Sequence, residues 1–196
     1  MNNAWLLKVS ADVEAKHGKA VRDKIFGDKV DNVWSDHASK SAWFENFTTE
    51  MDKLNDKDFL TATLIKHCPC GGGEAGFAKH AAILKESYDK SETLAEFVAT
   101  TNFYDKKKLD GNVLYLTKNK ARSKDTGLCG KGCHCGLAKH ADKYVSDIFC
   151  YCCTVGHTGR PFQIAFGDDI KIEFVDSLII GGKGCTMAIH LPEKTL

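Results

Sequence analysis

The feature that most constrains the fold of this chain is the alternation of apolar and polar residues near its C-terminus. From Ile170 to Ile180 the even positions are mostly apolar, whereas the odd positions include Lys171 and Glu173. A period of two over this length is typical of a β-strand with one buried face. After a glycine-rich turn at 181–184, apolar side chains return at alternate positions, namely Cys185, Met187, Ile189 and Leu191. These residues predict an antiparallel β-hairpin.

The first hundred residues have a different period, because their apolar side chains recur every three or four positions. One such row consists of Phe44, Phe47, Met51 and Leu54. This spacing is typical of amphipathic helices. Asp56 or Asp58 is placed to cap a following helix, and residues 74–88 and 91–101 carry two more apolar faces. Residues 1–105 are therefore predicted to be mainly helical.

Between these two parts the pattern is mixed. Residues 112–117 are β-prone, while residues 118–132 lack any period and are predicted to form a loop. Helical spacing returns with Leu137, Ala141, Tyr144 and Ile148. We interpret residues 150–153 as a strand and residues 161–166 as a short helix that begins at a proline and ends at a glycine.

Helices followed by an antiparallel hairpin predict an α+β fold. We expect N-terminal helices packed on a small antiparallel sheet that ends in a C-terminal β-hairpin. A length of 196 residues suits a single domain. This domain spans residues 1–196 and combines the helical part, 1–105, with a Cys-rich α+β part, 106–196.

Charge and hydropathy exclude several classes of partner. The chain has 27 basic and 26 acidic side chains, so no overall field attracts nucleic acid or an acidic membrane. The lysine clusters at 106–108 and 118–124 are predicted to be solvated loops. The apolar run at residues 4–7 is too short for a signal peptide, and no run is long enough to span a membrane. We therefore expect a cytoplasmic protein with reduced thiols, for which the sequence sets no oligomeric state.

The strongest chemical signal is the grouping of the cysteines. Six of the nine lie within residues 129–157, two more flank Pro69, and only Cys185 stands apart. The clustered thiols are Cys68, Cys70, Cys129, Cys133, Cys135, Cys150, Cys152 and Cys153. Zinc and iron–sulfur centres are held by about four soft ligands, usually delivered in short-spaced pairs. We predict a metal site from these thiols, whereas Cys185, on the apolar face of the hairpin, is predicted to be structural.

Histidines close to the thiols add candidate ligands or acid–base groups. His134 lies between two cysteines, His140 follows Cys135 by five residues, and His157 follows Cys153 by four. We assign His140 and His157 to cofactor binding. The Cys-X-Cys spacing of the thiol pairs is tighter than the Cys-X-X-Cys of zinc ribbons. One metal ion therefore requires that separate pairs meet in space.

Two alternatives to a metal site with a sensing or binding role remain open. A cysteine near a histidine can act as an activated nucleophile, so a metal-free cysteine-dependent hydrolase is the main rival. A structural zinc site in an interaction module is the third candidate. On a strand at residues 150–153, the side chains of Cys150 and Cys152 would share one face. We predict that these two line the metal or ligand cavity and that Cys153 is the more dispensable residue.

The C-terminal quarter of the chain also resembles a known group of domains. The matching motifs are Cys150-Tyr-Cys152-Cys153-Thr-Val-Gly-His157, Pro161-Phe162, Phe166-Gly167, residues 170–174 and Gly184-Cys185-Thr-Met-Ala-Ile189. They are similar to the ending of vinyl-reductase-type small-molecule-binding domains and of relatives of L-2-amino-thiazoline-4-carboxylic acid hydrolase. In these domains a Cys-containing strand precedes a Gly-aromatic helix and two further strands.

The resemblance implies an α+β domain with a small-molecule pocket between its helices and its sheet. Two positions depart from the usual pattern. His157 stands where an aromatic residue is common, and Lys183-Gly184 stands before Cys185 where an acidic residue is frequent. No catalytic residue carries over. The combined prediction is a cytoplasmic protein that holds zinc or an iron–sulfur cluster and binds or senses a small molecule, with the thiazoline-type hydrolase as the alternative.

Overall fold

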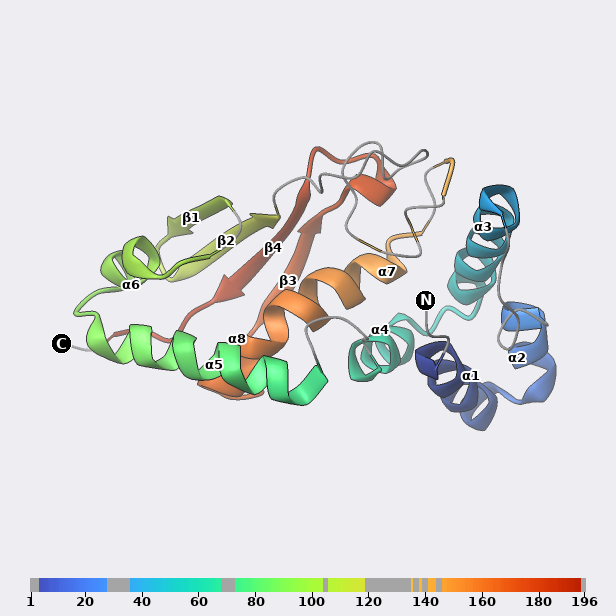
Figure 1. The fold of residues 1–196 in the computed structure, drawn as a ribbon, viewed down its shortest axis with the longest axis horizontal. Coiled ribbons are helices and arrows are strands. Elements are labelled where there is room, and N and C mark those ends of the chain that lie inside the picture. The colour runs from blue at the N-terminus through green and yellow to red at the C-terminus, as the bar shows by residue number, and fades with distance from the viewer. Residues whose placement is uncertain are drawn as a thin grey trace.

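A computed structural model describes residues 4–27, 36–67, 73–103, 106–118, 135, 138, 141–143 and 146–194. It confirms the predicted α+β fold, with helices first and an antiparallel sheet after them (Figure 1). The helices of the first half are α1 (Ala4–His17), α2 (Lys19–Phe26), α3 (His37–Lys53), α4 (Lys57–Lys66), α5 (Gly73–Lys90) and α6 (Leu94–Thr100). No helix within the described ranges is both long enough and apolar enough to cross a membrane.

Side-chain caps fix where several of these helices begin. Asp56 caps α4 as predicted, because its carboxylate accepts the backbone N–H of Phe59. Asp36 caps α3 in the same way and accepts the N–H of Ser39 at 2.8 Å. A cap of this kind satisfies one of the backbone donors that the first helical turn leaves without a partner.

The sheet has four antiparallel strands in the order β1-β2-β4-β3. These strands are β1 (Lys106–Asp110), β2 (Val113–Lys118), β3 (Ile172–Asp176) and β4 (Cys185–His190). The predicted strand at 112–117 and the predicted C-terminal hairpin are confirmed by β2 and by the pairing of β3 with β4. The buried side chains of β4 include Met187 and Ile189, as the alternation predicts.

The first strand of the hairpin is shorter than predicted. The chain leaves the sheet after Asp176, and Leu178–Ile180 form a short 3-10 helix, η5. Asp176 accepts the N–H of Lys183 at 3.1 Å and so closes the loop between the strands. A Cβ atom at Gly182 would lie 1.8 Å from Asp176 Oδ1, so any larger residue there would displace this carboxylate. Apolar residues of this loop continue the alternation in sequence without continuing the strand.

The lysines at 106–108 form strand β1, and the prediction of a loop there is wrong. Because β1 is the edge strand and most of its residues are exposed on both faces, it shows no alternation from which a strand could be predicted. Lys107 donates to the backbone oxygens of Ala99 and Thr101, which ties the strand to the end of α6.

A continuous helix crosses the molecule between residues 148 and 166. It consists of α7 (Ile148–Tyr151), the π-helical segment η4 (Cys152–Gly159) and α8 (Arg160–Phe166). The predicted short helix at 161–166 is confirmed, with Pro161 in its first turn and Gly167 at its end. The predicted helix face from 137 to 148 is not, because the described residues 141–143 and 146–147 are not helical.

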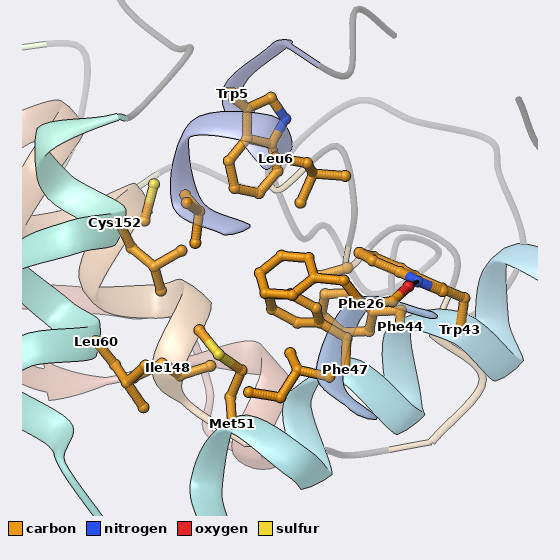
Figure 2. Packing of buried hydrophobic residues seen from close by; sticks show 14 of the residues in the cluster. Trp5, Leu6, Phe26, Trp43, Phe44, Phe47, Met51, Leu60, Ile148 and Cys152 are labelled. Carbon is orange, nitrogen blue, oxygen red and sulfur yellow. Dashed lines mark hydrogen bonds between the residues drawn. The ribbon is translucent and has the colours of Figure 1, made fainter. Parts of the chain in front are cut away.

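Two hydrophobic clusters make up the described core. The helical cluster lies among α1–α4 and is completed by later residues, and its largest members are Trp5, Phe26, Trp43, Phe44, Phe47 and Met51 (Figure 2). The sheet cluster lies between the sheet and the helices α5, α6 and α8, and it includes Phe97, Leu114, Leu116, Phe162, Met187 and Ile189. The helix at 148–166 contributes to both clusters, since Ile148 belongs to the first and Phe162 to the second.

Candidate active site around Cys153

The candidate site is built on η4, the middle of the helix at 148–166. In a π-helix the backbone hydrogen bonds run from residue i to i+5, and such turns are frequent at functional sites. Two glycines let η4 lie close to its neighbours. A Cβ atom at Gly156 would stand 3.2 Å from Ile65 of α4, and one at Gly159 would stand 2.9 Å from Ile172 of β3. The segment is therefore held between the helical part and the sheet (Figure 1).

Residues 150–153 are helical, so the prediction of a strand there is wrong. The resembled domains have a Cys-containing strand at this point, whereas here these residues belong to the helix that continues to Phe166. The hydroxyl of Thr154 donates to the backbone oxygen of Cys150 at 2.5 Å. Hydroxyl side chains often bond one turn back along a helix in this way.

Cys150 and Cys152 both belong to the helical cluster, although residues two apart on a helix do not share a face. Both side chains are buried in this cluster, and Figure 2 shows Cys152 together with Leu60 and Ile148. The thiol of Cys150 donates to the hydroxyl of Ser177 at 3.0 Å. Buried thiols of this kind behave as small apolar side chains. Their predicted role in lining a ligand cavity remains a prediction.

Cys153 has a different environment from its two neighbours in sequence. Its side chain is half-buried and carries a free thiol. The ammonium group of Lys118 lies 3.1 Å from Cys153 Sγ and also donates to the backbone oxygen of Cys153 at 2.6 Å. A cation in contact with sulfur stabilises the thiolate, which is the nucleophilic form of cysteine. Cys153 therefore combines partial exposure with direct contact to a positive charge.

Cys185 lies on the other side of Lys118. It begins β4 and stands directly opposite Lys118, the last residue of β2. Its thiol is free and buried. Burial raises the pKa of Cys185, and the charges of Cys153 and Asp176 raise it further, against the opposing effects of a backbone hydrogen bond from Leu178 and of Lys118. The prediction that Cys185 is buried on the core face of the hairpin agrees with this position.

His157 belongs to the same π-helical segment as Cys153. Residues four and five apart lie on one face of a π-helix, because its hydrogen bonds span five residues. His157 therefore stands one turn beyond Cys153 and Cys152 on η4. Its ring is half-buried and meets the edge of the Phe77 ring of α5 at 6.2 Å between centroids. A cysteine, a histidine and a lysine are thus gathered from two elements of the fold.

The other predicted ligands are only partly described by the structure. Cys68, Cys70, Cys129, Cys133 and His140 lie outside the described residues, as does His134. Cys135 is half-buried against the helical cluster, where its sulfur accepts the N–H of Ala138 at 3.5 Å. Within the described part of the chain, no group of three or more His, Cys, Asp or Glu side chains is placed to hold a metal ion.

Two members of the site were missed from the sequence. Lys118 was assigned to a loop, although it directly follows the β-prone residues 112–117 and ends the strand that they form. Ser177 is fully buried, and its hydroxyl oxygen accepts the thiol of Cys150. The β-prone run that ends at Lys118 is the available signal for the first, and no local signal marks the second.

The family model described as "Family of unknown function (DUF6144)" matches residues 8–196. Neither a curated protein nor a solved structure matches the chain significantly.

Proposed function

This chain belongs to the DUF6144 family, and we propose that it is a cysteine-dependent enzyme that acts on a small molecule with Cys153 as its nucleophile. The contact of 3.1 Å between Lys118 Nζ and Cys153 Sγ carries the proposal. Nucleophilic cysteines in enzymes react as thiolates, and an adjacent cation favours that form. Cys150 and Cys152 are set in the core, which leaves Cys153 as the reactive member of the trio.

The reaction that suits this arrangement is hydrolysis through a covalent intermediate. Cys153 Sγ attacks an electrophilic carbon, the bond from that carbon to nitrogen breaks, and the nitrogen leaves with a proton. His157 is the group on the same helical face that would supply this proton. Water then cleaves the carbon–sulfur bond and restores the thiol. Lys118 stabilises the negative sulfur before attack and again when it is released.

The resemblance of the C-terminal motifs suggests the class of substrate. We propose a small thiazoline-like carboxylate as the substrate, by analogy with L-2-amino-thiazoline-4-carboxylic acid hydrolase relatives. We also propose a cytoplasmic location, because a reducing compartment keeps the thiol of Cys153 available. The proposal includes neither nucleic acid nor a membrane surface as a partner, because a net charge of +1 does not attract either of them electrostatically.

The first test is acylation of the protein by p-nitrophenyl acetate, followed by peptide mapping. We expect a burst of nitrophenolate and one acetyl group on Cys153. Cys153→Ser should abolish the burst, and Lys118→Met should slow it by about tenfold, because the thiolate loses its counter-charge. Turnover of L-2-amino-thiazoline-4-carboxylic acid, followed by chromatography, should fall roughly 10³-fold in Cys153→Ser.

The matched controls use the same residue types outside the site. Cys152→Ala removes the neighbouring thiol, and Lys106→Met removes a lysine from the sheet edge. Both should leave acylation within about twofold of the unmodified protein, since Cys152 is packed in the helical cluster and Lys106 lies in the edge strand β1. Acylation that falls on another cysteine, or that is equal in Cys153→Ser, overturns the proposal.

A metal-binding function is the second candidate, and one observation favours it. The fold brings Cys135 onto the cluster that holds Cys150 and Cys152, although these thiols are separated by fifteen or more positions in sequence. Elemental analysis of the protein purified without chelators tests this candidate. About one zinc or an iron–sulfur cluster per chain, lost in Cys135→Ser but retained in Cys153→Ser, would support it. A metal content near zero in the unmodified protein would reject it.

A further inference from the structure

Lys118 stands between two thiols that come from distant parts of the sequence. It faces Cys185 across the β2–β4 pair, and its ammonium group contacts Cys153 Sγ at 3.1 Å. Side chains directly opposite each other on antiparallel strands lie on the same face, with Cβ atoms about 5 Å apart. The backbone of Lys118 therefore lies beside Cys185, and its side chain extends to Cys153. The segment η4 also packs against β4.

The thiols of Cys153 and Cys185 differ in their exposure to solvent. Cys185 is buried, with 7% of its surface exposed, whereas Cys153 is half-buried and has the cation beside it. A small oxidant in solution therefore meets Cys153 first. Cys185 is shielded from direct oxidation and remains a thiol beside it. Reactive and resolving cysteines of redox-sensitive proteins are divided in this way.

We propose that Cys153 and Cys185 form a reversible disulfide when a hydroperoxide oxidises Cys153. This deepens the proposed function, since it regulates the same nucleophile, but it does not depend on hydrolysis. The disulfide removes the thiolate from Cys153 and at the same time links η4 to β4. The modification therefore acts as a peroxide-dependent inhibitor of the site.

The chemistry balances in two steps. The thiolate of Cys153 attacks the peroxide, takes one oxygen to become a sulfenic acid, and releases an alcohol or water after protonation. Cys185 then gives up its proton and its sulfur attacks the sulfur of Cys153, the sulfur–sulfur bond forms, and the sulfenic hydroxyl leaves with that proton as water. The peroxide is reduced by two electrons and the two thiols are oxidised by two. Two equivalents of a small thiol reverse the change by exchange.

The neighbouring thiols are poorer partners for Cys153. The thiol of Cys150 is directed to Ser177, at 3.0 Å from its hydroxyl oxygen. Cys152 is buried in the helical cluster, together with Leu60 and Ile148 (Figure 2). Neither Cys153 nor Cys185 belongs to either described cluster.

The test treats the full, reduced chain with a limiting amount of hydrogen peroxide, followed by blocking of thiols and peptide mapping without reductant. We expect one dominant cross-linked pair, Cys153 with Cys185, that disappears on treatment with dithiothreitol. Cys185→Ser should instead accumulate a sulfenic acid on Cys153 that dimedone traps. Cys185→Val gives the same test with a side chain suited to an apolar site. Lys118→Met should slow the oxidation by about tenfold.

Cys152→Ala is the matched control and should form the same cross-link at the same rate. A cross-link between Cys153 and another cysteine, or irreversible oxidation of Cys153 while Cys185 stays reduced, overturns the inference. The outcomes distinguish a failure of this inference from a failure of the proposed enzymatic function. Acylation of Cys153 without a disulfide rejects the inference alone, whereas a disulfide in a protein that peroxide oxidises but esters do not acylate rejects the enzyme proposal alone.

Discussion

The helical cluster and the sheet cluster use sulfur in different ways. The helical cluster buries Cys150 and Cys152 among aromatic side chains, where thiols serve as small apolar residues. The sheet cluster holds the thioether of Met187 but no described cysteine. Cys153 and Cys185 belong to neither cluster among the described residues, and they lie where the helix at 148–166 passes from one to the other. Cys153, the proposed nucleophile, therefore lies outside both packed cores.

The largest expected effect tests whether the two clusters unfold together. Phe47→Ala removes a fully buried ring that packs on Trp43 and Phe26, and Phe97→Ala removes the equivalent ring of the sheet cluster. Each should lower the free energy of unfolding by about 3–5 kcal/mol, the usual cost of a large cavity. The measurement is urea denaturation followed by tryptophan fluorescence and by circular dichroism.

The tryptophans make this measurement selective, because all three lie within the first 43 residues. Their fluorescence therefore reports on the helical part of the chain. We expect Phe97→Ala to shift the fluorescence midpoint as far as the circular dichroism midpoint, since the helix at 148–166 joins the clusters. If Phe97→Ala leaves the fluorescence midpoint unchanged, the clusters unfold independently.

A smaller difference in unfolding free energy is expected between variants of Cys150 and of Cys153. Cys150→Ala removes a buried thiol and its hydrogen bond to Ser177, and should cost about 2 kcal/mol. Cys153→Ala lies outside both clusters and should cost less than about 1 kcal/mol. Cys150→Ala should in turn leave the alkylation rate of Cys153 by iodoacetamide unchanged. Equal costs for the two variants in urea denaturation would contradict the division between a structural and a reactive thiol.

The smallest expected effect is a loss of folding stability at alkaline pH that is caused by Cys185. The pKa of Cys185 is raised in the folded protein, chiefly by burial, with Cys153, Lys118 and Asp176 as the charged groups around it. Above the ordinary thiol pKa of about 8.5, the unfolded chain releases this proton while the folded chain retains it. The stability that Cys185 contributes is therefore complete below about pH 8.5 and is lost as the pH rises toward its folded pKa.

Thermal denaturation between about pH 7 and pH 10 provides the measurement. The unmodified protein should lose stability more steeply with rising pH than Cys185→Ala. The slope from one thiol is at most about 1.4 kcal/mol per pH unit, and other groups that titrate here are shared by both proteins. Parallel curves would show that Cys185 ionises as readily in the folded state as in the unfolded chain.

Local patterns predicted the elements whose burial is one-sided. The alternation around Ile172 and Ile189 gave the hairpin, and Asp56 marked the start of α4, because both signals arise within a few residues. The strand β1 had no such signal, since an exposed edge strand of lysines has no buried face. The helix at residues 150–153 was missed for another reason. Its conformation depends on Gly156 against Ile65, a contact between residues far apart in sequence.

The residue types of the candidate site could be predicted from the sequence, but the contact between Lys118 and Cys153 could not. The sequence predicts Cys153 as a metal ligand and His157 as a cofactor-binding residue, with a cysteine–histidine nucleophile as an open alternative, and the structure places both on one π-helical segment. The expectation that Cys153 is the dispensable thiol came from strand alternation, which does not apply to a helix. The lysine that distinguishes Cys153 comes from β2, thirty-five positions earlier, so only the register of the sheet reveals it.

The lysines of β1 have a consequence for the protein at high concentration. An exposed edge strand offers unpaired backbone groups to the edge of any neighbouring molecule, and sheets aggregate through such contacts. Residues 106–108 place three consecutive positive charges at this edge. Two copies that approached edge to edge would bring these charges together and repel each other, and Lys107 further occupies the edge by bonding to the end of α6. The strand that closes the sheet on one side thus also protects the protein against fibril-like self-association.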